Sequence, residues 1–268
     1  MALFREKLVK NWIFEIFFQL RKNTLAFVLL QKYNIVKYYY RSIGENMILY
    51  HGSPMIVQKP ELKKGKKYND YGQGFYCTKN IEMAKEWACT INNDGYSNEY
   101  QFDTLDLSIL NLQDTKYNIL NWLAILMENR KVDFSNALAI EGSKYIIENF
   151  LPDYKKYDVI IGYRADDCYF SFVKAFISNT ISLSQLSYIM KLGELGEQIV
   201  LKTDKAFERI KFVNAEFESR KDYYSKRKAR SDKAKLDFSN AFKNPDLNGI
   251  FMRDILKEGM KNDDPRLF

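Results

Sequence analysis

From residue 47 onward, hydrophobic positions gather in short runs separated by longer amphipathic stretches. The short runs are rich in Ile, Val, Tyr and Phe, which is typical of β-strands, and they cover residues 47–50, 74–78, 100–105, 157–162 and 198–202. The amphipathic stretches have helical spacing and cover residues 81–91, 119–130 and 135–149. Strands and helices do not alternate regularly, so the pattern predicts an α+β domain with a mainly antiparallel or mixed sheet.

The two ends of the chain have a different pattern. Residues 1–46 mix Trp, Phe and Leu with basic residues and predict a helical extension, either packed or lying on a membrane surface. From about residue 214 charged residues dominate, with Phe217 and Tyr224 at helical spacing, which predicts a solvated helix or a partner-binding one. We therefore expect a basic helical extension over 1–46, a main domain over 47–215 and a charged helical tail over 216–268.

The distribution of charge and the cysteine content bear on two classes of function, nucleic-acid binding and metal binding. The net charge is +7, but residues 1–46 hold eight Lys and Arg against three Glu, so the rest of the chain carries little net charge and gives no argument for nucleic-acid binding. The cysteines Cys77, Cys89 and Cys168 are widely spaced and the chain has one histidine, so we expect no metal site. Their odd number and the lack of a secretory pattern predict a cytoplasmic protein.

Two motifs carry candidate chemistry. The stretch ILYHGS at residues 48–53 is an apolar strand that ends at the only histidine, His51. Gly52 permits close approach of a ligand to the backbone and Ser53 adds a hydroxyl, although a histidine can simply end a strand. The stretch YGQGFYCT at residues 71–78 is a glycine turn that leads into an aromatic strand. Alone it fits a hairpin with a core tyrosine, because it lacks the context of a dinucleotide fingerprint.

Together, the two motifs resemble the ADP-ribosyltransferase superfamily, on the His-Tyr-Glu side shared by diphtheria toxin and the poly(ADP-ribose) polymerases. In that pattern HGS or HGT is followed by GxGxYF, by an aromatic residue eleven positions after the tyrosine, and by a glutamate that opens a late strand. The chain supplies HGS at 51–53, GQGFY at 72–76, Trp87, and EQIV at 197–200. The resemblance implies a split antiparallel or mixed sheet with flanking helices.

The chain also resembles a bacterial family known by sequence as a domain of unknown function. Five motifs carry this resemblance over residues 47–215, and they are LYHGS, a DYGQGFYCT segment, WL with NR, a YDVIIGYRADD segment, and a QIVLKT strand. Several genes of that family stand beside small partner genes in apparent toxin–antitoxin pairs. The resemblance therefore implies a toxin-like role and a small cognate antitoxin as partner.

The superfamily resemblance implies a role for each site residue, with NAD⁺ as co-substrate. Gly52 holds the nicotinamide amide through its backbone, Tyr76 and Trp87 sandwich the ring, and His51 binds a ribose, with Ser53 and Gly74 beside them. A glutamate would stabilise the oxocarbenium-like transition state. Glu197 fits that role from the EYIVY-like alignment, but the bacterial family often has glutamine at the place of Gln198. Neighbouring strand residues point to opposite faces, so only one of the two faces the cleft.

Two further segments are candidates beside this site. The loop over residues 61–69 carries Lys63, Lys64, Lys66 and Lys67, and it either closes over the pyrophosphate or forms a solvated lysine run. The pair Asp166 and Asp167 ends a predicted strand and lines the acceptor side, faces water or caps a helix.

The function expected from these residues is mono-ADP-ribosyl transfer to a macromolecule, either protein or nucleic acid. An NAD⁺ glycohydrolase would use the same residues with water as acceptor. If Gln198 faces the cleft, an inactive NAD⁺- or ADP-ribose-binding module is favoured. A non-enzymatic binder of nucleic acid or membrane through residues 1–46 is the remaining alternative.

Overall fold

The computed structural model describes residues 46–130, 132–165, 167–192, 197–243 and 246–268. The helical extension expected over 1–46 lies outside the described residues, except for Asn46, which begins the first strand. In the described part of the chain, no helix combines the length and the apolar character needed to cross a membrane.

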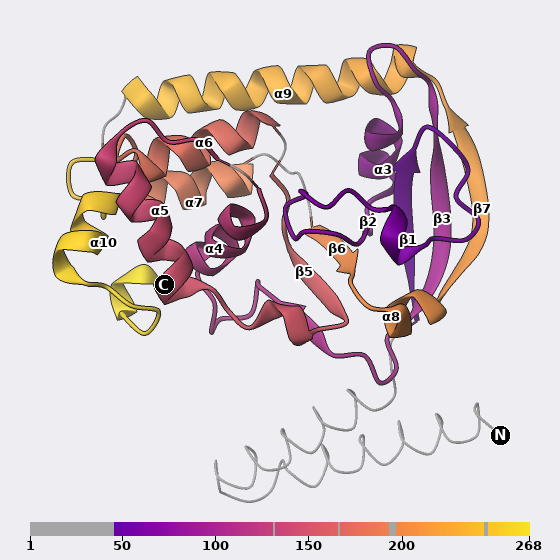
Figure 1. Cartoon of the computed structure of the whole chain (residues 1–268). Helices are drawn as coiled ribbons and strands as arrows, with labels where there is room; N and C mark the ends of the chain where they lie inside the picture. The colour runs from indigo at the N-terminus through magenta and orange to yellow at the C-terminus, as the bar shows by residue number, and fades with distance from the viewer. Residues whose placement is uncertain (1–45, 131, 166, 193–196, 244–245) are drawn as a thin grey trace, which may run out of the picture. The chain divides into compact units, whose positions relative to one another are not determined.

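The strands form two sheets (Figure 1). The first is antiparallel with the order β1-β3-β7, and its strands are β1 (Asn46–Ser53), β3 (Gly95–Asp103) and β7 (Ile210–Glu218). The second has the order β2-β6-β5-β4, and its strands are β2 (Phe75–Cys77), β4 (Ile109–Asn111), β5 (Val159–Tyr163) and β6 (Glu197–Leu201). It is mixed because β4 is parallel to β5, whereas β2-β6 and β5-β6 are antiparallel. The expected α+β class with antiparallel and mixed pairing is confirmed.

Helices fill the segments between the strands. They are α3 (Ile81–Ala88), α4 (Ile119–Asn129), α5 (Ala137–Phe150), α6 (Asp167–Ile177), α7 (Leu183–Leu192), α8 (Asp204–Glu208), α9 (Arg220–Lys243) and α10 (Met252–Glu258), with the 3-10 turns η1 (Leu62–Lys64), η2 (Tyr154–Lys156) and η3 (Pro265–Leu267). Several begin at a polar residue whose side chain accepts the first free backbone N–H groups, as Asn80 does for α3 and Thr203 for α8.

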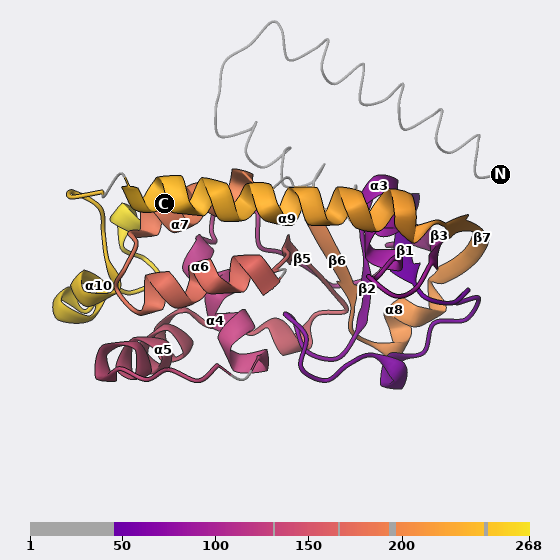
Figure 2. The same cartoon turned by 90° about the horizontal axis from the view of Figure 1, so that it is seen from above.

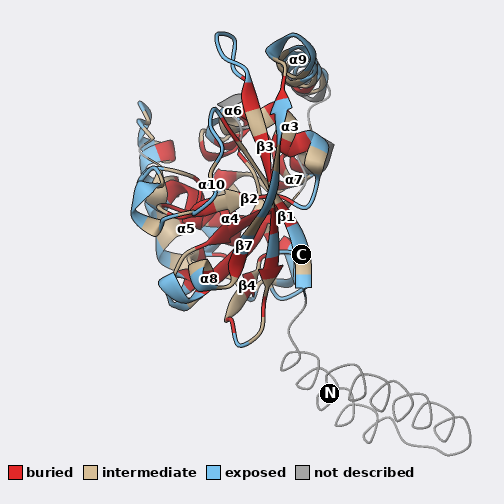
Figure 3. Ribbon diagram, turned by 90° about the vertical axis from the view of Figure 1, so that its right-hand side faces the viewer, coloured by how far each residue is buried: buried red, intermediate tan, exposed pale blue. Residues whose placement is uncertain are grey.

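Two hydrophobic clusters lie on opposite faces of the second sheet, which is buried on both sides (Figure 3). One cluster joins the two sheets, with Leu49 and Tyr100 of the first packed with Ile199 of the second. The other joins Ile160 and Val200 of the second sheet to the helical layer. Neighbouring residues of β6 therefore point alternately into the two clusters.

The charged tail differs from the prediction at its start. Residues 210–218 form β7, whereas a helix was expected from about residue 214, so residues 216–218 belong to the sheet and α9 begins at Arg220. Among the described strands, β7 pairs with β3 alone, and much of one of its faces is in solvent, with Phe217 62% exposed. Three of its nine residues are charged, and pairing with β3 satisfies the backbone N–H and C=O groups of the strand. The sequence pattern could not show that partner.

Candidate functional site

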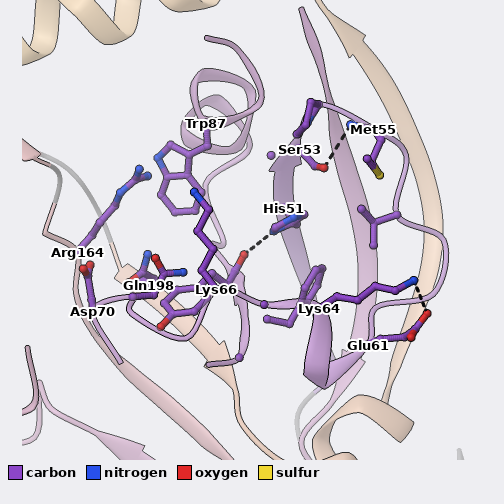
Figure 4. A pocket seen from close by; sticks show the side chains of 18 of the residues that line it. His51, Ser53, Met55, Glu61, Lys64, Lys66, Asp70, Trp87, Arg164 and Gln198 are labelled. Atoms are coloured by element: carbon purple, nitrogen blue, oxygen red, sulfur yellow. Dashed lines mark hydrogen bonds and ion pairs between the residues drawn. The ribbon is translucent and has the colours of Figure 1, made fainter. Parts of the chain in front are cut away.

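A cavity of about 710 Å³ lies where β1, β2, β6 and α3 meet. Its wall includes His51, Gly52, Tyr76, Trp87, Arg164 and Gln198, and Figure 4 shows several of these side chains around it. The loop between β1 and β2 forms another part of the wall. In total six basic and two acidic side chains line the cavity, so its electrostatic potential favours an anionic ligand.

His51 is a neutral hydrogen-bond acceptor toward the cavity. Its Nδ1 lies 2.7 Å from the backbone oxygen of Tyr76, and because a carbonyl only accepts, Nδ1 carries the proton. Burial lowers the pKa of the imidazole. The ring also packs on Phe75, with 4.4 Å between the centroids. In this neutral tautomer Nε2 has a free lone pair, which suits a ligand hydroxyl.

Tyr76 both lines the cavity and fixes the turn that precedes β2. Its hydroxyl donates to the Gly72 carbonyl at 2.5 Å and accepts from the Tyr71 backbone N–H at 3.1 Å. Gly72 has φ +74°, a left-handed conformation that favours glycine. Burial raises the pKa of the Tyr76 phenol, so this side chain stays protonated and acts through its ring and its hydroxyl.

Trp87 reaches the cavity from α3, which packs directly on β1. A Cβ at Gly52 would lie 2.1 Å from the Ala84 carbonyl oxygen, so glycine is required there by the helix itself. Glycine at position 52 is therefore explained by its packing against α3 as well as by the expected approach of a ligand. The Arg164 guanidinium stacks on the Trp87 ring at 3.8 Å. The buried Trp87 Nε1 has no hydrogen-bond partner among the described residues.

Gln198, and not Glu197, lies on the cavity wall. Tyr76 is paired with Val200, and Gln198 is two residues from Val200, so Gln198 and Tyr76 share one face of the sheet. Gln198 is 6% exposed, and no described residue donates to its buried Oε1.

The Glu197 side chain belongs to the opposite face of β6. Its carboxylate lies 3.6 Å from Lys79 Nζ outside the cavity. The expectation that Glu197 faces the cleft is therefore corrected by the alternation of the strand, which favours the alternative that the sequence left open.

The remaining residues expected at the site are divided between the cavity and other places. Ser53 and Gly74 line it, and the Ser53 hydroxyl accepts from the Met55 N–H at 3.3 Å. Of the lysines in the loop over 61–69, Lys64 and Lys66 line the cavity and Lys63 and Lys67 do not. Asp166 lies outside the described residues, and Asp167 is the first residue of α6.

A network of one ion pair and one hydrogen bond around Asp70 stabilises the site. It was not recognised from the sequence, although its residues belong to the motifs. Asp70 forms an ion pair with Arg130 at 2.9 Å and accepts from the Ala165 N–H at 2.9 Å. These three residues come from the DYG, NR and ADD motifs, so motifs far apart in sequence converge beside the Tyr76 turn. Each motif held a residue able to form part of this network, but only the fold shows that the partners meet.

Lys202, the residue that follows β6, supports the same turn. Its Nζ donates to the backbone oxygens of Tyr71 and Gln73, the latter at 2.6 Å. Burial lowers the pKa of this amine to about 8. The residue lies in the QIVLKT motif, yet nothing in that motif indicated a contact with the glycine turn.

Comparisons with known proteins identify a family without an assigned function. Searches of the curated proteins and of the solved structures gave no match. The family model described as "Protein of unknown function (DUF3990)" matches residues 47–212, which is more than half of the chain and nearly the stretch over which the five motifs lie. The chain therefore belongs to the DUF3990 family.

Proposed function

We propose that this chain binds NAD⁺ in the cavity and transfers its ADP-ribose to a macromolecular acceptor. The observation that carries the proposal is the convergence of His51, Tyr76, Trp87 and Gln198 on one cavity. These residues come from β1, β2, α3 and β6, in the chain order of the His-Tyr-Glu pattern. At the late strand, the amide of Gln198 stands in place of the carboxylate of that pattern.

The size and the polarity of the cavity suit a dinucleotide. Ligand pockets are typically about 300–1,000 Å³, and this cavity is about 710 Å³. The excess of basic side chains on its wall suits a pyrophosphate. Trp87 Nε1 and Gln198 Oε1 are a buried donor and a buried acceptor that have no hydrogen-bond partner in the described part of the chain. Leaving such groups unpaired costs about 1–3 kcal/mol each, so a ligand with carbonyl and hydroxyl groups would be stabilised here.

Each of three wall residues would contact a different part of the ligand. The His51 Nε2 lone pair accepts from a ribose hydroxyl, and the Tyr76 ring offers a face for stacking. Trp87 already stacks with a flat cation, the Arg164 guanidinium. The nicotinamide ring of NAD⁺ is also a flat cation, so the electron-rich indole face favours it over the neutral reduced ring.

The turnover rate that we expect depends on the side chain of Gln198. Breaking the nicotinamide–ribose bond develops positive charge at the ribose carbon, and a dipole aimed at that carbon lowers the barrier. The Gln198 Oε1 provides such a dipole and accepts from a ribose hydroxyl. An amide oxygen carries only a partial charge, so we expect slower turnover than a carboxylate at this position would give.

The second candidate is a module that binds NAD⁺ or ADP-ribose without turnover. The observation that favours it is that the neutral Gln198 lies on the cavity wall. The acidic residue of β6, Glu197, lies outside the cavity.

The experiment compares the wild-type chain with Gln198→Glu, Gln198→Ala and Glu197→Gln. Each is incubated with labelled NAD⁺ and a cell lysate, and nicotinamide release and labelled macromolecules are followed. The proposal expects labelled macromolecules from wild type, more from Gln198→Glu, a loss in Gln198→Ala, and no change in Glu197→Gln.

Other outcomes separate the alternatives. Nicotinamide release without labelling would indicate a glycohydrolase. NAD⁺ binding without release from wild type, with turnover only in Gln198→Glu, would favour the binding module. A loss of activity in Glu197→Gln with Gln198→Ala unchanged would contradict the assignment of Gln198.

A further inference from the structure

Helix α9 reaches the cavity although it lies beyond the residues that the family model matches. The match ends at residue 212, and α9 spans Arg220–Lys243. Figures 1 and 2 show the helix running from the end of β7 past α3 and across α6 and α7. Arg227 of α9 lines the cavity together with Trp87 of α3.

Three contacts attach α9 to α3 along neighbouring helical faces. Lys226 pairs with Glu82 at 3.1 Å, and Arg230 pairs with Glu86. In addition, the Arg227 Nη1 donates to the backbone oxygen of Cys89, the residue that follows α3, at 3.3 Å. On α9, Arg230 lies four positions from Lys226 and three from Arg227, and the contact residues on the α3 side are four and three positions apart, so neighbouring helical turns carry the contacts. Trp87 is therefore held from β1 and from α9.

The charge of Arg227 distinguishes it from its two neighbours. Lys226 and Arg230 each have a glutamate partner. The hydrogen-bond partner of Arg227 is a neutral carbonyl, and among residues 46–268 that the structure describes, no carboxylate lies within salt-bridge distance of it. A guanidinium on a cavity wall with no acidic partner attracts an anion, and its fork of N–H groups matches phosphoryl oxygens.

We propose that α9 completes the ligand site and that Arg227 binds a phosphoryl oxygen of the ligand. The inference deepens the proposed function, on which it rests for the identity of the ligand as a dinucleotide. It also assigns a part in binding to α9, which lies outside the family-matched region. The contact with Cys89 orients the guanidinium, so the anion would meet a group that is already positioned.

The test measures binding to the full chain by calorimetry, with four probes: inorganic pyrophosphate, ADP-ribose, NAD⁺ and nicotinamide. The variants are Arg227→Ala, Arg227→Lys and the matched control Lys228→Ala, whose side chain is exposed on the same helix and does not line the cavity. We expect Arg227→Ala to weaken binding of the three phosphate-bearing probes by on the order of tenfold to a hundredfold, the range for a hydrogen bond to a charged group. Lysine should restore part of that affinity. Lys228→Ala should leave all affinities unchanged.

The outcomes separate this inference from the proposed function. Pyrophosphate binding that Arg227→Ala abolishes, in a chain that does not bind NAD⁺, would support the phosphoryl site and contradict the dinucleotide function. Equal weakening of nicotinamide and pyrophosphate in Arg227→Ala would mean that α9 only supports α3. Unchanged pyrophosphate affinity, or no binding of any phosphate-bearing probe by wild type, would overturn the assignment of Arg227.

Discussion

His51 is the only histidine of the chain, so its protonation can be followed without overlap. Burial lowers the pKa of its imidazole from the usual 6.5. Below pH 6.5 the unfolded chain therefore takes up a proton that the folded chain does not. The stabilising contribution of the neutral ring is complete above that pH and is lost as the pH falls toward the folded pKa.

We expect the unfolding free energy to decrease as the pH falls from 6.5 toward the folded pKa, and the NAD⁺ affinity to decrease at lower pH, as the pH falls through that lowered pKa. The affinity decreases because a protonated Nε2 donates and no longer accepts. The imidazole resonances of this single histidine give the pKa directly by nuclear magnetic resonance, and His51→Gln should lack this part of the pH dependence. A titration at or above 6.5 in the folded chain would contradict the neutral acceptor.

Tyr76 allows its ring and its hydroxyl to be tested separately. Tyr76→Phe keeps the ring but leaves the Gly72 carbonyl and the Tyr71 N–H without their partner. We expect a loss of about 1–2 kcal/mol in unfolding free energy, measured by urea denaturation, together with weaker NAD⁺ binding. Tyr145→Phe is the control, because that hydroxyl bonds the Met260 carbonyl away from the cavity. An equal effect of both variants on NAD⁺ affinity would show that the Tyr76 turn does not shape the site.

At the scale of elements, the supports of the cavity come from segments that are far apart in the chain. Asp70 precedes β2, Arg130 follows α4 and Ala165 follows β5, and the ion pair and the N–H bond at Asp70 hold these three connections together. The Asp70 side chain is 5% exposed. A buried charge that loses its partner is costly, whereas replacing both partners is not.

We therefore expect Asp70→Asn to destabilise the fold by about 3 kcal/mol. Arg130→Met in the same chain should recover part of that loss, because it removes the charge left unpaired. A double-mutant cycle of urea denaturation curves measures the coupling, which we expect to be about 1 kcal/mol or more. Additive effects of the two substitutions would mean that the pair does not link the two connections.

The elements were predictable from sequence to the extent that local pattern decides them. The strands around residues 47–50 and 157–162 and the helices that begin near residues 81 and 119 match the hydrophobic spacing. The prediction of a helix was wrong at residues 216–218, because an edge strand with one solvated face can carry charged residues as a solvated helix does. The choice between Glu197 and Gln198 depended on the register of β6 against β2, which is a tertiary fact.

The candidate site was predictable in part for the same reason. His51, Gly52, Ser53, Gly74, Tyr76 and Trp87 lie on the cavity wall, because a motif carries both the side chain and the turn that presents it. Arg164 and Arg227 were not recognised. Each is an ordinary charged residue until the fold brings β5 and α9 to the same cavity.

At the scale of the whole molecule, the family-matched residues and the C-terminal segment share one hydrophobic core. Met252, Ile255, Met260 and Leu267 follow the matched region, and all four are buried in the cluster that also holds Ile160 and Val200 of the second sheet. Met252 contacts α5 closely enough that a Cβ on Gly142 would lie 2.8 Å from its Cγ. The tail is therefore part of the folding unit that supports the cavity.

This arrangement predicts that Met252→Ala is costly although residue 252 lies outside the family model. Met252 is 0% exposed, and removing a buried methionine side chain costs about 2–5 kcal/mol, since a cavity remains where the side chain was. Leu247→Ala is the matched control in the same segment, because Leu247 is 86% exposed and its loss should change stability by less than about 0.5 kcal/mol. Urea denaturation of both variants measures the difference. If Met252→Ala unfolded at the wild-type midpoint, the segment that holds Met252 would be an independent appendage, and the cavity would not depend on it.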